Sequence, residues 1–287
     1  MTRTTQFLLA SVLLGHVALA QAPAAAAQKV VSGELGFDFT SQYFVRGIVQ
    51  ENQGIIAQPW FELSYGLYEG TDDLRNLRLV FGQWNSLHDG PTGSGGTGQS
   101  MWYESDFFFG LAGAIGDRLS VGATYTAYYG PNGARGTVEE LALSAGYDDK
   151  GKSLIDSIES GLQPGVVLAF ELDGQMDNGE PGNNGVYLQA GIRPSFVFGQ
   201  FTLDVPVTMG FSLMDYYENP GSSEDDFLGF LDVGAVMSTT IPSLPARMGQ
   251  WQAHAGIHWL LLGDNNEDRN VGDTTELIFS CGVSTIF

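Results

Sequence analysis

The chain ends with the stretch ELIFSCGVSTIF, which runs from Glu276 to Phe287. Successive side chains of an extended strand point to opposite faces, so every second residue of this stretch shares a face. One face is almost wholly apolar and carries Leu277, Phe279, Cys281, Val283, Thr285 and Phe287. Terminal residues are ordinarily frayed and polar, whereas Phe287 completes an apolar stripe. The pattern predicts that the final strand is held within a sheet.

The same period-two alternation recurs along the chain and predicts an all-β protein. A strand that crosses a bilayer at a tilt needs about 9–11 residues. Soluble strands usually have about 5–6 residues. The predicted strands are long enough for the bilayer and number twelve, at about 33–46, 55–68, 76–87, 101–115, 118–129, 137–147, 163–173, 185–198, 201–213, 227–240, 250–262 and 274–287.

The links between these strands alternate in character. Tight or basic links follow the even strands, as at 116–118 and 199–200, and longer links rich in Gly, Asn and Asp follow the odd strands, as at 88–100. Short periplasmic turns and long outer loops are typical of outer-membrane barrels. An even strand count then predicts that both termini are periplasmic. The link 148–162 is long for such a turn, and its part 153–160 is a candidate short helix.

The N-terminus has the pattern of a secretory signal peptide. Arg3 precedes a short apolar run from Phe7 to Ala20, and small residues offer cleavage after Ala20 or after Ala27. The run is too short to favour the alternative of a membrane-anchoring helix. We therefore expect a signal peptide and small-residue leader at 1–27, and a single barrel domain at 28–287 in the outer membrane of a Gram-negative-type bacterium.

Composition narrows the function classes. The 39 glycines and 12% aromatic residues suit closed β-structure. The formal net charge of −21 argues against binding nucleic acid, whose phosphates require Lys and Arg. Cys281 is the single cysteine, so no intramolecular disulfide forms. The alternative of a soluble β-sandwich is disfavoured, because sandwiches turn about every 8–12 residues.

Three motifs resemble catalytic or ligand-binding signatures in a context that does not support them. Residues 146–153 match the P-loop pattern and residues 93–98 match the dinucleotide fingerprint, but neither begins a helix after a parallel strand. His254 and His258 would lie about 13 Å apart on one strand face, at about 3.3 Å per residue, and cannot chelate one ion together. We expect no cofactor and no metal centre.

The polar faces of the strands predict the lining of a lumen. A charge that faces lipid costs about 2–4 kcal/mol near the bilayer midplane, so charged side chains should point inward. Nine carboxylates stand against three arginines and two histidines in this set. The candidate pore-lining residues are Asp38, Arg46, Glu62, Arg78, Glu104, Asp106, Glu140, Glu171, Arg193, Asp204, Asp232, His254, His258 and Glu276.

The stretch Gly36 to Ile48, GFDFTSQYFVRGI, is aromatic-rich and leads into Arg-Gly-Ile. It resembles the opening of the TorF-type porin family, and the C-terminal strand resembles the closing strand of bacterial outer-membrane porins. The resemblance covers these segments and the signal peptide. It implies an outer-membrane barrel in which Arg46 lies inside, near the outer rim of the first strand. The closing strand would present Phe279, Val283 and Phe287 to the barrel-insertion machinery.

The sequence therefore predicts a passive channel for small solutes, with a preference for cations set by acidic side chains. One alternative is a non-conducting barrel that acts through its acidic outer loops. A second is an outer-membrane lipid hydrolase that uses His254 or His258 with a nearby serine. Arg–carboxylate pairs across the lumen would favour the first alternative, and a Ser–His hydrogen bond at the outer rim would favour the second. The other expected partners are membrane lipid and lipopolysaccharide, the latter bridged to the loops by divalent cations.

Overall fold

The computed structural model describes residues 30–95, 99–152, 155, 158–177, 179, 182–219, 223–244, 247 and 249–287. The predicted signal peptide and both of its cleavage sites lie outside these residues, as does half of the candidate helix at 153–160. Among the described residues, the helix α1 (Asp264–Arg269) has six residues, and no helix is long and apolar enough to cross a membrane.

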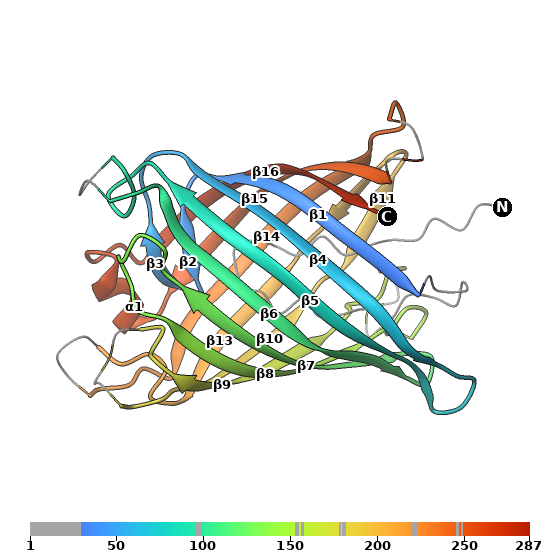
Figure 1. Cartoon of the computed structure of the whole chain (residues 1–287), viewed down its shortest axis with the longest axis horizontal. Coiled ribbons are helices and arrows are strands. Elements are labelled where there is room, and N and C mark those ends of the chain that lie inside the picture. Colours follow the sequence, from blue (N-terminus) through green and yellow to red (C-terminus); the bar gives the residue numbers. More distant parts are fainter. Residues whose placement is uncertain are drawn as a thin grey trace.

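The chain forms a closed antiparallel barrel of twelve strands (Figure 1). Each strand pairs with its sequence neighbours, and the first pairs with the last from Glu34↔Ile286 to Thr40↔Ser280. Pro194 and Pro206 each divide one wall strand into two segments, because proline has no N–H to donate to the ladder. The wall strands are β1 (Val31–Thr40), β4 (Ile56–Glu69), β5 (Leu74–His88), β6 (Trp102–Ile115), β7 (Leu119–Tyr129), β8 (Val138–Tyr147), β9 (Gly165–Asp173), β10 (Val186–Ile192) with β11 (Ser195–Phe198), β12 (Phe201–Asp204) with β13 (Val207–Met214), β14 (Leu228–Thr240), β15 (Gln250–Leu262) and β16 (Thr275–Ile286).

The two faces of the wall differ as the alternation predicts. In β1, Leu35, Phe37 and Phe39 are exposed on the outside, whereas Asp38 is 1% exposed on the inside. The outer face continues around the barrel with exposed residues such as Phe81 and Phe109. So large an exposed apolar surface is costly in water and suits contact with lipid hydrocarbon.

The two ends of the barrel also differ. The links 70–73, 116–118, 148–164, 199–200 and 241–249 join strands at one end, here called the turn end, where β1 begins and β16 ends (Figure 1). The links 41–55, 89–101, 130–137, 174–185, 215–227 and 263–274 lie at the other end, here called the loop end. The backbone amide of Phe287 donates to the carbonyl of Gly33 at 2.9 Å, and the amide of Gly33 donates back at 3.1 Å. The prediction that the final strand is held within a sheet is confirmed, and this strand pairs with the first strand.

The prediction of one strand at 33–46 is wrong beyond Thr40. The link after β1 folds into the barrel and forms a separate two-stranded sheet from β2 (Tyr43–Val45) and β3 (Ile48–Glu51), which we call the inserted hairpin (residues 43–51). Arg46 and Gly47 have φ angles of +51° and +83°, which reverse the chain between β2 and β3. The wall does not need this segment for closure, because β1 and β4 pair directly from Val31↔Tyr65 to Thr40↔Ile56.

Candidate functional site

The inserted hairpin occupies the loop-end half of the barrel interior (Figure 1). Its side chains Tyr43, Phe44, Val45 and Ile48 are all buried and join one apolar cluster with residues of the wall. The ring of Tyr43 lies 5.2 Å from that of Trp84 on β5. Burial of apolar side chains in a polar lumen gives the hairpin a packed resting position there.

Arg46 at the hairpin tip is held by an acidic and aromatic pocket. Its two terminal nitrogens donate to the two carboxylate oxygens of Glu140 on β8, at 2.5 and 2.8 Å, and one of them also donates to the hydroxyl of Tyr216 at 2.8 Å. The guanidinium carbon lies 4.2 Å from the ring centroid of Tyr187 and 5.5 Å from that of Tyr216. The hydroxyl of Tyr128 donates to Glu140 at 3.3 Å. We call Glu140, Tyr128, Tyr187 and Tyr216 the arginine pocket.

The backbone of the hairpin tip is held as well. The hydroxyl of Tyr217 donates to the carbonyl of Arg46 at 2.9 Å. A Cβ added to Gly47 would lie 2.9 Å from both the Cβ of Phe230 and the side-chain nitrogen of Asn266. The tip therefore fits closely against β14 and α1.

A second set of contacts fixes the sides of the hairpin. The hydroxyl of Tyr43 donates to Glu104 at 2.8 Å, and Arg135 from the link 130–137 donates to the other oxygen of that carboxylate at 2.6 Å. On the other hairpin strand, Glu51 accepts from the amide and the hydroxyl of Thr92 at 2.9 and 2.8 Å. Hydrogen bonds to charged groups in a buried setting are stronger than neutral ones, so these contacts stabilise the inserted position.

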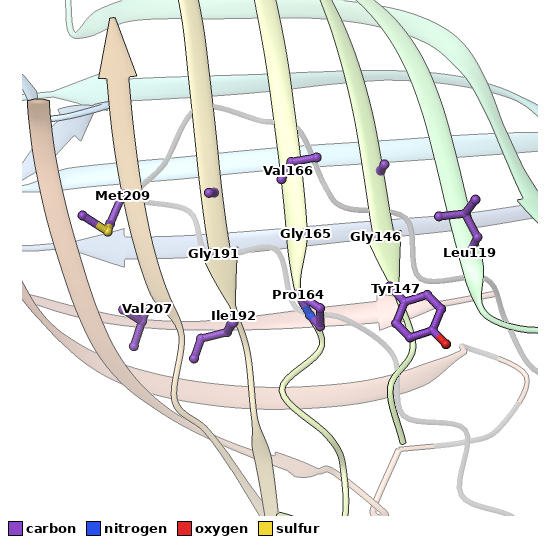
Figure 2. Close-up of a pocket in the computed structure, with 12 residues that line it drawn as sticks. Leu119, Gly146, Tyr147, Pro164, Gly165, Val166, Gly191, Ile192, Val207 and Met209 are labelled. Atoms are coloured by element: carbon purple, nitrogen blue, oxygen red, sulfur yellow. The ribbon is translucent and has the colours of Figure 1, made fainter. Parts of the chain in front are cut away.

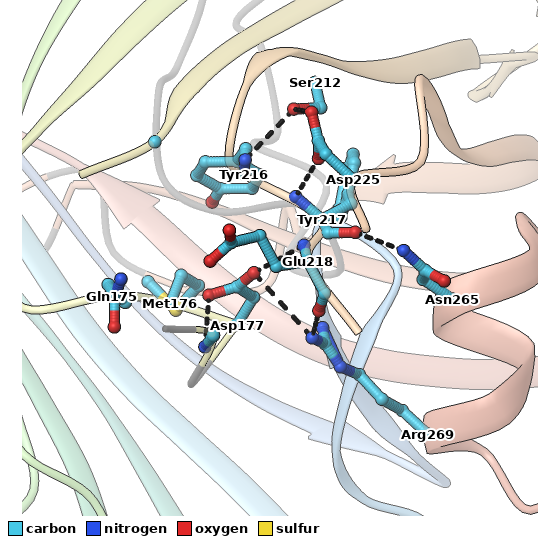
Figure 3. Close-up of polar contacts among 12 residues, drawn as sticks. Gln175, Met176, Asp177, Ser212, Tyr216, Tyr217, Glu218, Asp225, Asn265 and Arg269 are labelled. Atoms are coloured by element: carbon cyan, nitrogen blue, oxygen red, sulfur yellow. Dashed lines mark hydrogen bonds and ion pairs between the residues drawn. The ribbon is translucent and has the colours of Figure 1, made fainter. Parts of the chain in front are cut away.

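Residues of three links at the loop end, 174–185, 215–227 and 263–274, form a buried polar cluster (Figure 3). Asp177 accepts from the backbone amides of Gly179 at 2.9 Å and Glu218 at 2.7 Å, and it lies 3.7 Å from the guanidinium of Arg269 on α1. Arg269 also donates to the carbonyl of Glu218. Burial raises the pKa of Asp177 and lowers the pKa of Arg269. We call these residues the loop cluster.

A branch of the loop cluster holds the link 215–227. The carboxylate of Asp225 accepts from the hydroxyl of Ser212 at 2.7 Å and from the amide of Tyr217 at 3.0 Å (Figure 3). Asn265 of α1 donates to the carbonyl of Tyr217 at 2.5 Å. Tyr216 and Tyr217, which contact Arg46, are therefore positioned by the links at the loop end.

The two histidines on β15 each face an aspartate, His254 facing Asp38 on β1, beyond β16, and His258 facing Asp232 on the neighbouring β14. The ring nitrogen Nε2 of His254 lies 2.8 Å from Asp38, and Nδ1 of His258 lies 2.8 Å from Asp232. Asp38 also accepts from the indole of Trp60 at 2.8 Å. No group of three or more metal-ligating side chains is placed for an ion within the described part of the chain.

The turn-end half of the interior is polar and lined by small side chains. Glu34 and Glu62 lie directly opposite each other on β1 and β4. Arg78 on β5 donates to the hydroxyls of Ser32 at 2.9 Å and Ser64 at 2.8 Å. The neighbouring inner positions include Gly66, Gly122, Ser144, Gly146, Gly191 and Gly282.

The predicted pore-lining residues fall into distinct places. Arg46 is on the inserted hairpin rather than the wall, and Glu140 binds it. Arg193 pairs with Asp204 at 2.9 Å near the turn end. Glu276 is half-buried and accepts from Gln42 at 2.8 Å. The remaining side chains that are buried on the inner face of the wall are Asp38, Glu104, Asp106, Glu171, Asp232, His254 and His258, and those that are half-buried there are Glu62 and Arg78.

Several residues of the site were not among the predicted ones. The period-two pattern places Tyr128 on the polar face of β7, which was a usable signal. Tyr187 also alternates with outward residues on β10. Arg135, Tyr216 and Tyr217 lie in or beside loops, where alternation carries no information about direction.

The nucleotide-binding motifs have ordinary structural roles. Residues 146–152 end β8 and enter a turn, in which Asp149 accepts from the amides of Leu162 at 3.0 Å and Gln163 at 2.8 Å. Residues 93–95 lie in a turn at the loop end, and 96–98 are outside the described residues. In the described parts of both segments no residue starts a helix that could bind a phosphate.

A cavity of about 530 Å³ lies in the wall and opens to the outer side of β7–β10 and β13 (Figure 2). Its lining is apolar and includes Val166 and Tyr147, which are exposed on the outer face of the barrel. Small residues such as Ala145 and Ala190 form its floor. This depression belongs to the lipid-facing surface and is separate from the lumen.

No family model matches the chain, and no curated protein matches it in sequence, so the resemblance to the TorF-type family is not confirmed. Solved structures of similar architecture include an outer membrane channel from Pseudomonas putida F1, which is 13% identical with a TM-score of 0.48 and covers 92% of this chain and 97% of that one. The NanC porin is 11% identical with a TM-score of 0.44, over 88% of this chain and 98% of that one. With identities and TM-scores this low, these likenesses identify no function for the chain.

Proposed function

We propose that this protein is a porin-like outer-membrane channel for small solutes, and that the inserted hairpin closes it at the loop end. The observation that carries the proposal is the independence of the wall from the hairpin. β1 and β4 hydrogen-bond to each other over the full length of β1, so the hairpin can leave the lumen without breaking a strand pair of the wall. A segment with that freedom suits a gate.

The interior supports passage of polar solutes once the hairpin has moved. Glycine and serine line much of the turn-end half, where a structural plug would instead need bulky side chains. The charged side chains there include Glu34, Glu62 and Arg78. Because the lining as a whole carries more carboxylates than arginines, we expect cations to pass in preference to anions.

The expected surroundings follow from the same architecture. The apolar outer face suits outer-membrane lipid, and divalent cations would bridge the acidic outer loops to lipopolysaccharide. The closing strand β16, with Phe279, Val283 and Phe287 exposed on its outer face, is the segment that barrel-insertion machinery would bind.

Planar-bilayer conductance tests the proposal. The wild-type barrel should conduct rarely, whereas a variant with residues 42–54 replaced by a short Gly-Ser link should show steady currents whose reversal potential favours cations. Heat-modifiable migration on gels establishes that both proteins are folded. A folded variant that carries no current would overturn the channel proposal.

A specific observation favours a second candidate, a non-conducting barrel that acts through its loops. The Arg46–Glu140 pair crosses the interior, and both side chains are 1% exposed. The wild-type recordings separate the candidates, because a barrel that the hairpin fills permanently never conducts while the hairpin is present, whereas a gated channel opens at times. Lipid hydrolysis has less support: Ser86 hydrogen-bonds His88 at 2.7 Å, but both side chains are fully buried.

A further inference from the structure

We propose that the arginine pocket is a binding site for guanidinium-bearing solutes, and that Arg46 occupies it as an internal ligand when the channel is closed. The inference names the class of solute recognised by the proposed channel and in that respect rests on the proposed function. Binding itself, however, needs no conductance. It is therefore testable on the isolated barrel.

The pocket matches a guanidinium group at each of its recognition features. Glu140 offers both carboxylate oxygens to the two terminal nitrogens, at 2.5 and 2.8 Å. Tyr216 adds a hydroxyl acceptor at 2.8 Å, and the face of Tyr187 lies 4.2 Å from the cation. A planar fork of donors satisfies a bidentate carboxylate and an aromatic face together, which a compact ammonium does less well.

The pocket belongs to the wall and the loops, not to the hairpin. Tyr128 is on β7, Glu140 on β8 and Tyr187 on β10, and Tyr216 is in the link 215–227. When the hairpin leaves, the strand pairs that carry Tyr128, Glu140 and Tyr187 are unbroken, and Glu140 loses its guanidinium partner. The carboxylate of Glu140 and the rings beside it then favour entry of another cation.

The backbone at Arg46 indicates that its side chain, not the turn, is the reason for this residue. Arg46 has a φ of +51°, in the left-handed region that glycine adopts without steric cost. An arginine there is disfavoured relative to glycine or asparagine as a turn residue. The conformation of Arg46 places its guanidinium in the pocket. A role as an internal ligand explains why an arginine stands at this position of the turn.

The test uses Arg46→Gly, which empties the pocket and relieves the backbone. Thermal unfolding of the detergent-solubilised barrel is followed with methylguanidinium, methylammonium or sodium as the chloride salt, at low millimolar concentrations that do not denature. We expect a saturable rise in Tm with methylguanidinium, an apparent affinity about tenfold weaker for methylammonium, and no response to sodium. Wild type should respond far less, because Arg46 competes for the same groups.

The control is Arg46→Gly combined with Glu140→Gln, which keeps the shape of the pocket and removes its charge. The rise in Tm should then be lost. If Arg46→Gly does not fold, Arg46→Lys replaces it, and methylguanidinium should still give a smaller saturable rise by displacing the ammonium. A folded variant that does not respond, or that responds equally with Glu140→Gln, overturns the inference. A conducting barrel with no such response refutes the pocket alone, whereas a response without conductance leaves the pocket and refutes the channel.

Discussion

At the scale of one residue, Gly47 contributes to the proposed closure of the channel through both its backbone conformation and its lack of a side chain. Its φ of +83° allows the hairpin turn, and its lack of a side chain allows the tip to approach Phe230 and Asn266. Gly133, in the link 130–137 at the loop end, has a φ of +75°, but no described atom lies within 4 Å of an added Cβ. Substitutions at Gly47 and at Gly133 therefore distinguish the effect of backbone strain from the effect of close packing.

We expect Gly47→Ala to displace the hairpin tip and to raise the open probability in bilayer recordings. Gly133→Ala, which suffers the strain alone, should cost about 1 kcal/mol or less and leave the conductance unchanged. The measurements are urea unfolding and single-channel recording on both variants. Equal effects of the two substitutions would show that the close fit at the tip does not hold the channel closed.

Asp177 predicts a pH dependence of the loop cluster. Burial raises its pKa above the ordinary value of 3.8, so the folded cluster binds a proton more readily than the unfolded loops do. The stability that Asp177 gives to the folded loop cluster is therefore fully present below the ordinary pKa. It is lost as the pH rises through the raised pKa. Glu218 adds to the raised pKa, and Arg269 opposes it.

Hydrogen exchange at the Glu218 amide, which donates to Asp177, measures this effect. After correction for the intrinsic exchange rate, protection should fall as the pH rises from below 3.8 through the raised pKa of Asp177. Asp177→Asn keeps a side-chain oxygen acceptor and removes the titration, so its protection should be flat over the same range. A pH-dependent loss that persists in Asp177→Asn would assign the effect to another group.

At the scale of elements, the sequence predicts the wall better than its contents. Alternation over long strands is a local property, and the twelve predicted strands correspond to the observed wall strands. The hairpin was missed because Tyr43 to Val45 reads as a continuation of β1. Its inward path depends on Glu140 and Tyr216, which are 94 and 170 residues away along the chain from Arg46. No local pattern contains those contacts.

The closing strand carries a prediction about assembly. The ring of Phe287 packs so closely on Gly33 that an added Cβ there would lie 2.5 Å from it. We expect Phe287→Ala to lower the yield of folded barrel in the presence of insertion machinery while leaving the conductance of the folded fraction unchanged. Phe198→Ala, at another exposed phenylalanine near the turn end, is the matched control. Normal assembly of Phe287→Ala would refute the sorting role.

At the scale of the whole molecule, the outer face determines which environment the barrel can occupy. Leu143 is 45% exposed on the outer side of β8, and Val271 is 94% exposed in a loop beyond the strands. Leu143→Arg should destabilise the barrel in lipid vesicles by about 2–4 kcal/mol, because its charge faces hydrocarbon. Val271→Arg should change the stability by less than about 0.5 kcal/mol. Urea titration of vesicle-inserted protein measures both, and equal costs would contradict a lipid-facing wall.

The direct pairing of β1 with β4 makes the segment between them exchangeable. Thr40 and Ile56 are ladder partners, so any segment that begins and ends at these two positions starts from ends already held together. A foreign loop, such as a ligand-binding peptide or a reporter tag, could replace residues 41–55 without altering the hydrogen-bond register of the barrel. The same geometry that lets the hairpin enter the lumen thus makes this joint a natural insertion point for engineering the protein as a display scaffold or a sensor pore.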